Sequence, residues 1–156
     1  MINQKFFFIA SIFFITAPLQ SQILSNLEIE EGMKIEIFLS DIDSPRQMAQ
    51  GRDGRIYVGS RNSGKIFAIR DTDDNGVSDE KILVAENLTF ATGVSLHDGD
   101  LYFSEIDKIW KVTNIASKLD QDPLRLPKKE LITDNLPSDK WHGWKWIKHD
   151  QNGNLY

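Results

Sequence analysis

The chain has 156 residues, of which 40% are hydrophobic and 26% charged, and it contains no cysteine. This composition is typical of a globular protein, and it excludes a disulfide framework, a thiolate metal centre, a cysteine nucleophile and a cysteine-borne lipid anchor. The formal net charge is −5 and no block of lysine and arginine occurs. We therefore expect no nucleic acid partner and no attraction to an anionic membrane surface.

The N-terminus has the pattern of a secretory signal peptide. Lys5 supplies a positive charge, residues 6–18 (FFFIASIFFITAP) form a compact apolar run, and residues 19–22 are mostly polar. A membrane-spanning helix needs about 20 apolar residues, and this run is shorter. The sequence predicts a signal peptide over residues 1–22 and a periplasmic or secreted protein without a membrane anchor.

Three later segments share one pattern. They are DGRIYV at residues 53–58, DGDLYF at residues 98–103 and NGNLY at residues 152–156. Asp-Gly or Asn-Gly between alternating apolar residues favours a tight hairpin turn, because both turn positions must tolerate a positive φ. Asp98 follows Asp53 by 45 residues, and Asn152 follows Asp98 by 54 residues. The chain therefore contains an internal repeat of about this length.

Four strands in a unit of about 45 residues are typical of a β-propeller blade. We predict an all-β fold in which residues 23–156 form about two and a half blades. Residues 46–88 and 92–136 are complete blades, residues 142–156 begin the next one, and residues 33–42 are an outer strand that closes a blade formed elsewhere. The chain is then an N-terminal fragment of a larger ring, since this number of blades cannot close one. A self-contained β-sandwich is the alternative.

A propeller binds small molecules at the mouth of its central channel, where loops enter the innermost strands. Those loops are residues 44–47, 90–93 and 140–144, here called the mouth segments, and we expect them to converge. His142 is the histidine in these segments, and an imidazole can accept a proton near neutral pH. A structural histidine in a tryptophan-rich corner is the alternative. The other candidate mouth residues are Arg46, Gln47, Thr92, Trp141 and Trp144.

Two further features could bind ions. Residues 71–79 (DTDDNGVSD) alternate oxygen-bearing side chains and place glycine sixth, as a calcium loop does. The candidate structural calcium ligands are Asp71, Asp73, Asn75 and Asp79, although acidic turns of this kind also occur without metal. Arg61 follows the second strand of the first blade and is a candidate for binding an anion, with a solvated turn as the alternative.

The order of several motifs resembles the glucose/sorbosone dehydrogenase family, and its sorbosone dehydrogenase branch more closely. The motifs are GMKIEIF, PRQMA, YVGSR, GKIFA and LPSDKWHGW, at residues 32–38, 45–49, 57–61, 64–68 and 136–144. Proteins of this family are exported six-bladed propellers that use pyrroloquinoline quinone (PQQ). The lead Leu-Pro-Ser-x-Lys-x-His is the most specific part, because the soluble glucose enzymes carry their catalytic histidine after it.

The resemblance implies that His142 is the general base, which takes a proton from the substrate hydroxyl while a hydride passes to PQQ. Trp141 stands where the glucose enzymes have aspartate, and Thr92 stands where the family often has an amide, so the sugar specificity is open. The family binds PQQ and its catalytic calcium through later blades. We therefore expect this chain alone to be inactive.

The resemblance implies a small-molecule sugar or aldehyde as substrate and an electron acceptor as partner. One alternative is a calcium-dependent propeller lactonase, which needs carboxylates at the mouth. Residues 44–47 and 90–93 contain no aspartate or glutamate, which counts against it. The other alternative is an exported propeller that binds a sugar or a protein without catalysis.

Overall fold

The structure is a computed structural model and describes residues 27–156. The predicted signal peptide, residues 1–22, lies outside the described residues. By its internal contacts the chain divides after Glu36. In the first unit, the described residues contain a turn in which the Met33 amide donates to the Glu30 carbonyl, and an exposed ion pair between Lys34 and Glu36.

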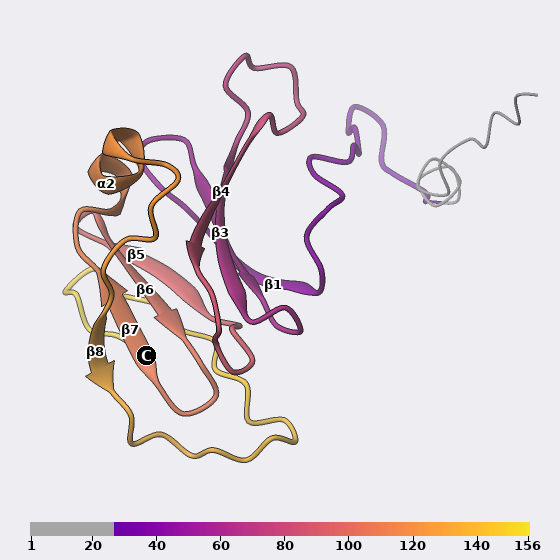
Figure 1. Cartoon of the computed structure of the whole chain (residues 1–156). Coiled ribbons are helices and arrows are strands. Elements are labelled where there is room, and N and C mark those ends of the chain that lie inside the picture. The colour runs from indigo at the N-terminus through magenta and orange to yellow at the C-terminus, as the bar shows by residue number, and fades with distance from the viewer. Residues whose placement is uncertain (1–26) are drawn as a thin grey trace, which may run out of the picture. The chain divides into compact units, whose positions relative to one another are not determined.

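The second unit, residues 37–156, is mostly β (Figure 1). Its first antiparallel sheet has the order β1-β2-β3-β4. The strands are Pro45–Gln50, Ile56–Ser60, Lys65–Arg70 and Glu80–Ala85. Ile66 and Ala68, at alternate positions of β3, are buried, as the alternation in KIFAIR predicts. In the predicted Asp-Gly turn before β2, Gly54 has a φ of 82°.

The second antiparallel sheet has the order β5-β6-β7-β8. Its strands are Val94–His97, Asp100–Ser104, Ile109–Val112 and Glu130–Thr133. Asp98 and Gly99 form a two-residue turn with φ values of 49° and 82°, the backbone that an Asp-Gly hairpin requires. Each sheet has a register shift where its third strand meets its fourth.

A short helix, α2 (Ile115–Gln121), lies between β7 and β8. The four-strand repeat did not predict a helix in this segment. Ile115 and Leu119 are buried in the core, and their spacing of four residues places them on one helical face. Tertiary packing of this pair stabilises a helix that is too short to form alone.

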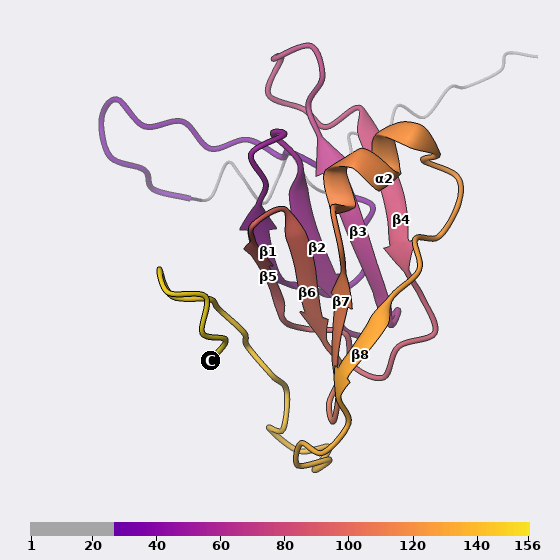
Figure 2. The same ribbon diagram turned by 90° about the vertical axis from the view of Figure 1, so that its left-hand side faces the viewer.

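The two sheets pack against each other, with β1 beside β5 (Figure 2). One cluster of buried side chains spans both sheets and the helix, with Tyr57, Ile66, Leu101, Phe103 and Ile115 among its members. Gly59 lies so close to the Thr92 carbonyl that a Cβ at this position would overlap it. Glycine therefore permits this close approach of the two sheets.

The last residues begin a further pairing. Lys148 and Tyr156 exchange backbone hydrogen bonds of 3.0 Å, and His149 pairs with Leu155 in one antiparallel bridge. Residues 33–42 form no strand, and their predicted partners are outside this chain, so that strand stays a prediction. Among residues 27–156, no helix has both the length and the apolar character needed to cross a membrane.

Candidate functional site

The three mouth segments converge, although they are distant in sequence. The Gln47 amide nitrogen donates to the Thr92 carbonyl at 3.3 Å, which joins the first segment to the second. The Ser104 hydroxyl accepts from the Gly93 amide at 2.9 Å and donates to the Lys145 carbonyl at 3.0 Å. The innermost strands β1 and β5 and the chain after residue 144 therefore meet at one place.

The Gln47 side chain joins β1 to Ile147, which follows the third mouth segment. Its side-chain amide donates to the Ile147 carbonyl at 2.6 Å and accepts from the Ile147 amide at 3.1 Å. These two bonds satisfy both ends of the carboxamide. Gln47 is thus occupied in positioning the backbone that carries Trp144 and Trp146.

Thr92 does not present its side chain to solvent. It is 1% exposed, and its hydroxyl donates to the Phe90 carbonyl at 2.8 Å. Because the hydroxyl is used locally, Thr92 fixes the turn of the second mouth segment rather than offering a free group to a ligand.

His142 is exposed and has a φ of 59°, in the left-handed region that non-glycine residues seldom adopt. Its ring lies 6.0 Å from the ring of Trp144, tilted by 50°. Trp141, beside it in sequence, is 89% exposed. The third mouth segment thus presents an imidazole to solvent next to an indole, which is an arrangement suited to proton transfer with a ligand that stacks on Trp144.

The ring of Trp144 contacts two arginines from the first sheet. The guanidinium carbons of Arg46, in β1, and Arg61, after β2, lie 5.2 Å and 4.5 Å from its ring centroid, within the range of cation–π contacts. The indole N–H is buried and has no hydrogen-bond partner among residues 27–156. The sequence analysis placed Arg46 and Trp144 at the mouth, and the structure adds Arg61 to them.

Arg46 also lines a hollow of about 590 Å³. Its walls are residues 46–50 of β1, residues 94–96 of β5 and residues 146–149. These are the innermost strands of the repeat units, so the hollow runs along the side where a propeller has its channel. The pair of arginines and His142 lie at the end of this wall where the mouth segments enter.

The acidic loop between β3 and β4 is organised by its own hydrogen bonds. Asp71 accepts from the backbone amides of Gly76 at 2.7 Å, Asn75 at 3.2 Å and Asp73 at 3.3 Å. Asp79 accepts from the amide of Thr72 at 2.9 Å and from its hydroxyl at 2.5 Å. Among residues 27–156, no three His, Asp or Glu side chains gather as metal ligands would. Calcium at Asp71, Asp73, Asn75 and Asp79 stays a prediction.

These hydrogen bonds also act on acidity. The Gly76 amide is the main cause of a lowered pKa at Asp71, and the Thr72 hydroxyl is the main cause of a lowered pKa at Asp79. Both carboxylates are therefore stabilised in their charged form, whether or not a cation is bound.

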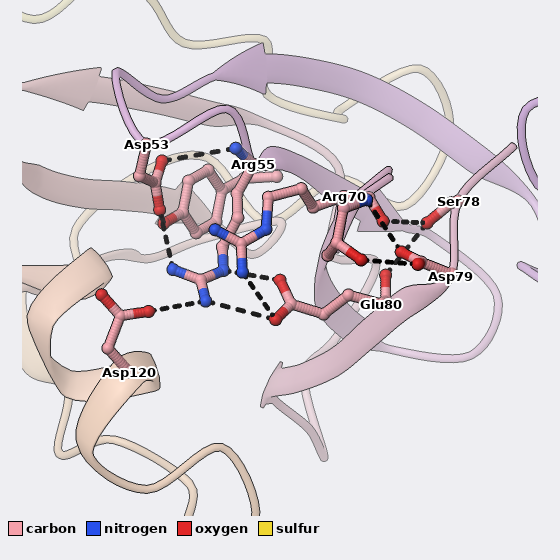
Figure 3. A network of polar contacts seen from close by, with 9 residues as sticks. Asp53, Arg55, Arg70, Ser78, Asp79, Glu80 and Asp120 are labelled. Atoms are coloured by element: carbon pink, nitrogen blue, oxygen red, sulfur yellow. Dashed lines mark hydrogen bonds and ion pairs between the residues drawn. The ribbon is translucent and has the colours of Figure 1, made fainter. Parts of the chain in front are cut away.

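A buried ionic network links the two sheets and was not foreseen from the sequence (Figure 3). Arg55 is 2% exposed and pairs with Asp53 at 2.9 Å, Glu80 at 2.8 Å and Asp120 at 2.7 Å. Asp53 and Glu80 belong to the first sheet's unit, whereas Asp120 belongs to α2. Burial opposes the charge of Arg55, but the bonds to Glu80, Asp120 and Asp53 outweigh it and raise its pKa.

The other two histidines form a separate group on the second sheet. The His97 and His149 rings stack at 5.1 Å, and the Tyr102 ring lies 4.4 Å from His149. The Ser95 hydroxyl contacts His149 Nδ1 at 2.9 Å. Burial, with a smaller contribution from His97, lowers the pKa of His149. Packing thus favours the neutral form of His149.

No protein-family model matches the sequence. An uncharacterised protein of Borreliella burgdorferi is 31% identical over 147 residues, which cover 92% of this chain. The chain spans about a third, 34%, of that relative's length. This relative therefore shows that much of the sequence recurs in a longer protein, without giving a function.

The fold resembles part of a solved PQQ domain. The holo form of the pyranose dehydrogenase PQQ domain from Coprinopsis cinerea is similar over 74% of this chain and 27% of that chain, with a TM-score of 0.56 and 15% sequence identity. At this identity the likeness concerns the fold. The two four-stranded sheets are thus arranged as in a portion of a PQQ-domain propeller.

Proposed function

We propose that this chain is the N-terminal part of an exported six-bladed propeller dehydrogenase that oxidises a sugar or a sugar aldehyde with PQQ. The observation that carries the proposal is the position of His142, exposed beside Trp144 where the mouth segments converge. The similarity of the fold to a PQQ domain and the LPSDKWHGW motif support it. About two and a half blades of the ring then lie in this chain.

In this proposal His142 is the general base. The neutral imidazole accepts the proton of the substrate hydroxyl as the carbon that bears this hydroxyl loses its hydrogen as a hydride, so that the alcohol becomes a carbonyl. PQQ, when bound, would accept the hydride and thus the two electrons. His142 suits this role better than His149, whose Nδ1 contacts Ser95 and whose ring is packed between His97 and Tyr102.

The described residues do not make a complete PQQ site by themselves. PQQ carries three carboxylates, and in the proposal a calcium ion accompanies it. The hollow at the innermost strands offers Arg46 and Lys148 as cations, and residues 27–156 gather no set of three acidic or histidine metal ligands. We propose that the remaining ligands of PQQ, the ligands of the catalytic calcium and the contact with the electron acceptor belong to other blades of the whole protein.

The test is PQQ titration of the full-length protein. Absorbance reports binding of PQQ, and reduction of a dye with aldoses and sugar aldehydes as substrates reports turnover. We expect binding and dye reduction in the wild type. In the His142→Gln variant, loss of the general base lowers kcat by about 10²–10⁴-fold, while PQQ affinity is retained.

His97→Gln is the matched control, because it makes the same substitution at a histidine that lies outside the mouth segments and stacks on His149. It keeps wild-type turnover. Activity that survives in His142→Gln overturns the base assignment. A full-length protein that binds no PQQ overturns the whole proposal.

A further inference from the structure

Arg46 and Arg61 both contact the ring of Trp144. Both guanidinium carbons lie within 5.2 Å of the centre of one indole ring, that of Trp144. Arg46 is exposed in β1 and Arg61 half-buried after β2, so two strands of the first sheet deliver them to the third mouth segment. Two positive charges are therefore held at one indole ring.

Neither arginine forms an ion pair within residues 27–156, whereas five cations of the two sheets and their turns do. Arg61 Nε donates to the Asn62 side-chain oxygen at 3.0 Å, which leaves its terminal nitrogens without a described partner. The paired cations are Arg55, Arg70, Lys81, Lys108 and Lys111. Like charges at one ring repel each other, and the indole face reduces that repulsion only in part. An anion between them would remove it.

We infer that Arg46 and Arg61, aligned by Trp144, form an anion-binding site for a carboxylate or phosphate group. Planar guanidinium groups bind both anions through paired N–H donors. Because His142 lies 6.0 Å from Trp144, the anion and the reacting hydroxyl would belong to one small molecule or to two that meet at the mouth. This inference rests on the proposed function for the sugar nature of the ligand, and it adds that the ligand carries a negative charge.

Two sources of that anion are distinguishable. A sugar acid or sugar phosphate would bring it as part of the substrate, and PQQ would bring it as one of its own carboxylates. Isothermal titration of the full-length protein without PQQ, using glucuronate, glucose 6-phosphate and glucose, measures the first. Titration with PQQ alone, followed by absorbance, measures the second.

If the substrate is the source, glucuronate or glucose 6-phosphate binds roughly tenfold or more tightly than glucose, as expected for charge-assisted hydrogen bonds. Arg46→Gln and Arg61→Gln each abolish this preference and leave PQQ affinity unchanged. If PQQ is the source, the same variants weaken PQQ binding to a similar extent and leave the three sugars equal. Either result supports an anion site.

Arg52→Gln is the charge-matched control, because Arg52 is exposed on the turn after β1 and does not contact Trp144. Arg46→Lys and Arg61→Lys keep the charge and retain part of the preference. Equal binding of charged and neutral sugars together with unaltered PQQ binding in both glutamine variants overturns the inference. The proposed function survives that result if dye reduction persists, and the anion site survives a failure to reduce dye if glucuronate still binds.

Discussion

The two sheets carry opposite charges at one equivalent position. The first residue after the Asp-Gly turn is Arg55 in the first sheet and Asp100 in the second. Arg55 reaches Glu80 in β4 and Asp120 in α2 of the neighbouring unit. Asp100 pairs with Lys111 at 2.7 Å on the adjacent strand and accepts from the Asn114 amide at 2.9 Å.

This difference shows that the turn and the charge have separate causes. The turn fixes the backbone, so it recurs wherever a hairpin is needed. The charge depends on what packs against the turn: Arg55 faces carboxylates from its own sheet and from α2, whereas the ion-pair partner of Asp100 lies on the adjacent strand of its own sheet. The buried cation of the first sheet therefore shares a carboxylate of α2 in addition to those of its own sheet, whereas Asp100, within residues 27–156, has no ion-pair partner outside the second sheet.

Arg55→Ala is the sharpest way to break this comparison. It leaves the carboxylates of Asp53, Glu80 and Asp120 without their shared cation. Because these carboxylates are partly exposed and Glu80 keeps its ion pair with Arg70, the expected cost is about 2–3 kcal/mol. Asp100→Ala costs about 1 kcal/mol, because the Asp100 side chain is itself 18% exposed, whereas that of Arg55 is 2% exposed. Urea unfolding followed by tryptophan fluorescence measures both. Equal losses in the two variants would contradict the difference that we draw.

A smaller effect is expected at the contact between the sheets. Gly59→Ala places a methyl group against the Thr92 carbonyl, and forced overlap of this kind costs about 1–3 kcal/mol. Ser104 is the equivalent residue of the second sheet, and it faces the Lys145 carbonyl with a hydrogen bond instead. Ser104→Ala removes this bond and the bond from the Gly93 amide, and it costs about 1–2 kcal/mol. Thermal unfolding of both variants checks the order, and a neutral Gly59→Ala would show that the sheets can separate without cost.

The histidine group gives a pH dependence that sharpens the contrast between His149 and His142. Because burial lowers the pKa of His149 in the folded state, its contribution to stability is complete above the unfolded value near 6.5 and is lost as the pH falls through the folded value. We expect the midpoint temperature of thermal unfolding to decrease as the pH is lowered from 7 to 5. The fall is smaller in His149→Gln and unchanged in His142→Gln. A wild-type midpoint that is constant over this range would refute the prediction.

The acidic loop is expected to give the smallest effect. The carboxylates of Asp71 and Asp79 have lowered pKa values, so their contribution is present above about pH 4 and is lost below it. If the loop binds calcium, the metal raises the unfolding midpoint of the wild type and not that of Asp71→Asn. Asp122→Asn, on an exposed turn elsewhere, is the control. A midpoint that is insensitive to calcium and EDTA argues against a metal at this loop.

The hairpins could be predicted because Asp-Gly turns and alternating apolar residues act locally. The sequence placed the strand pairs around Gly54 and Gly99 for this reason. The helix α2 could not be predicted in the same way, because two apolar residues, Ile115 and Leu119, acquire their meaning only from the core that receives them. A local pattern predicts local structure, and packing decides the rest.

The candidate site was predictable in outline and less so in its members. The repeat indicated which loops precede the innermost strands, and this brought His142, Arg46 and Trp144 to one place. It could not indicate that Thr92 turns its hydroxyl to its own backbone, or that Arg61 reaches Trp144 from another strand. The Arg55 network had no signal either, because Asp120 is distant in sequence and lies on an unforeseen helix.

The double hydrogen bond between Gln47 and Ile147 has a consequence for the order of events during folding. The strand pairs of each sheet join residues that are near in sequence, so they can form soon after their segments leave the ribosome. The Gln47 carboxamide must wait for a partner 100 residues later. Closing so long a loop is slow and gains little until both sheets stand in place. We therefore expect this clamp to close after the hairpins, and the mouth to be assembled last.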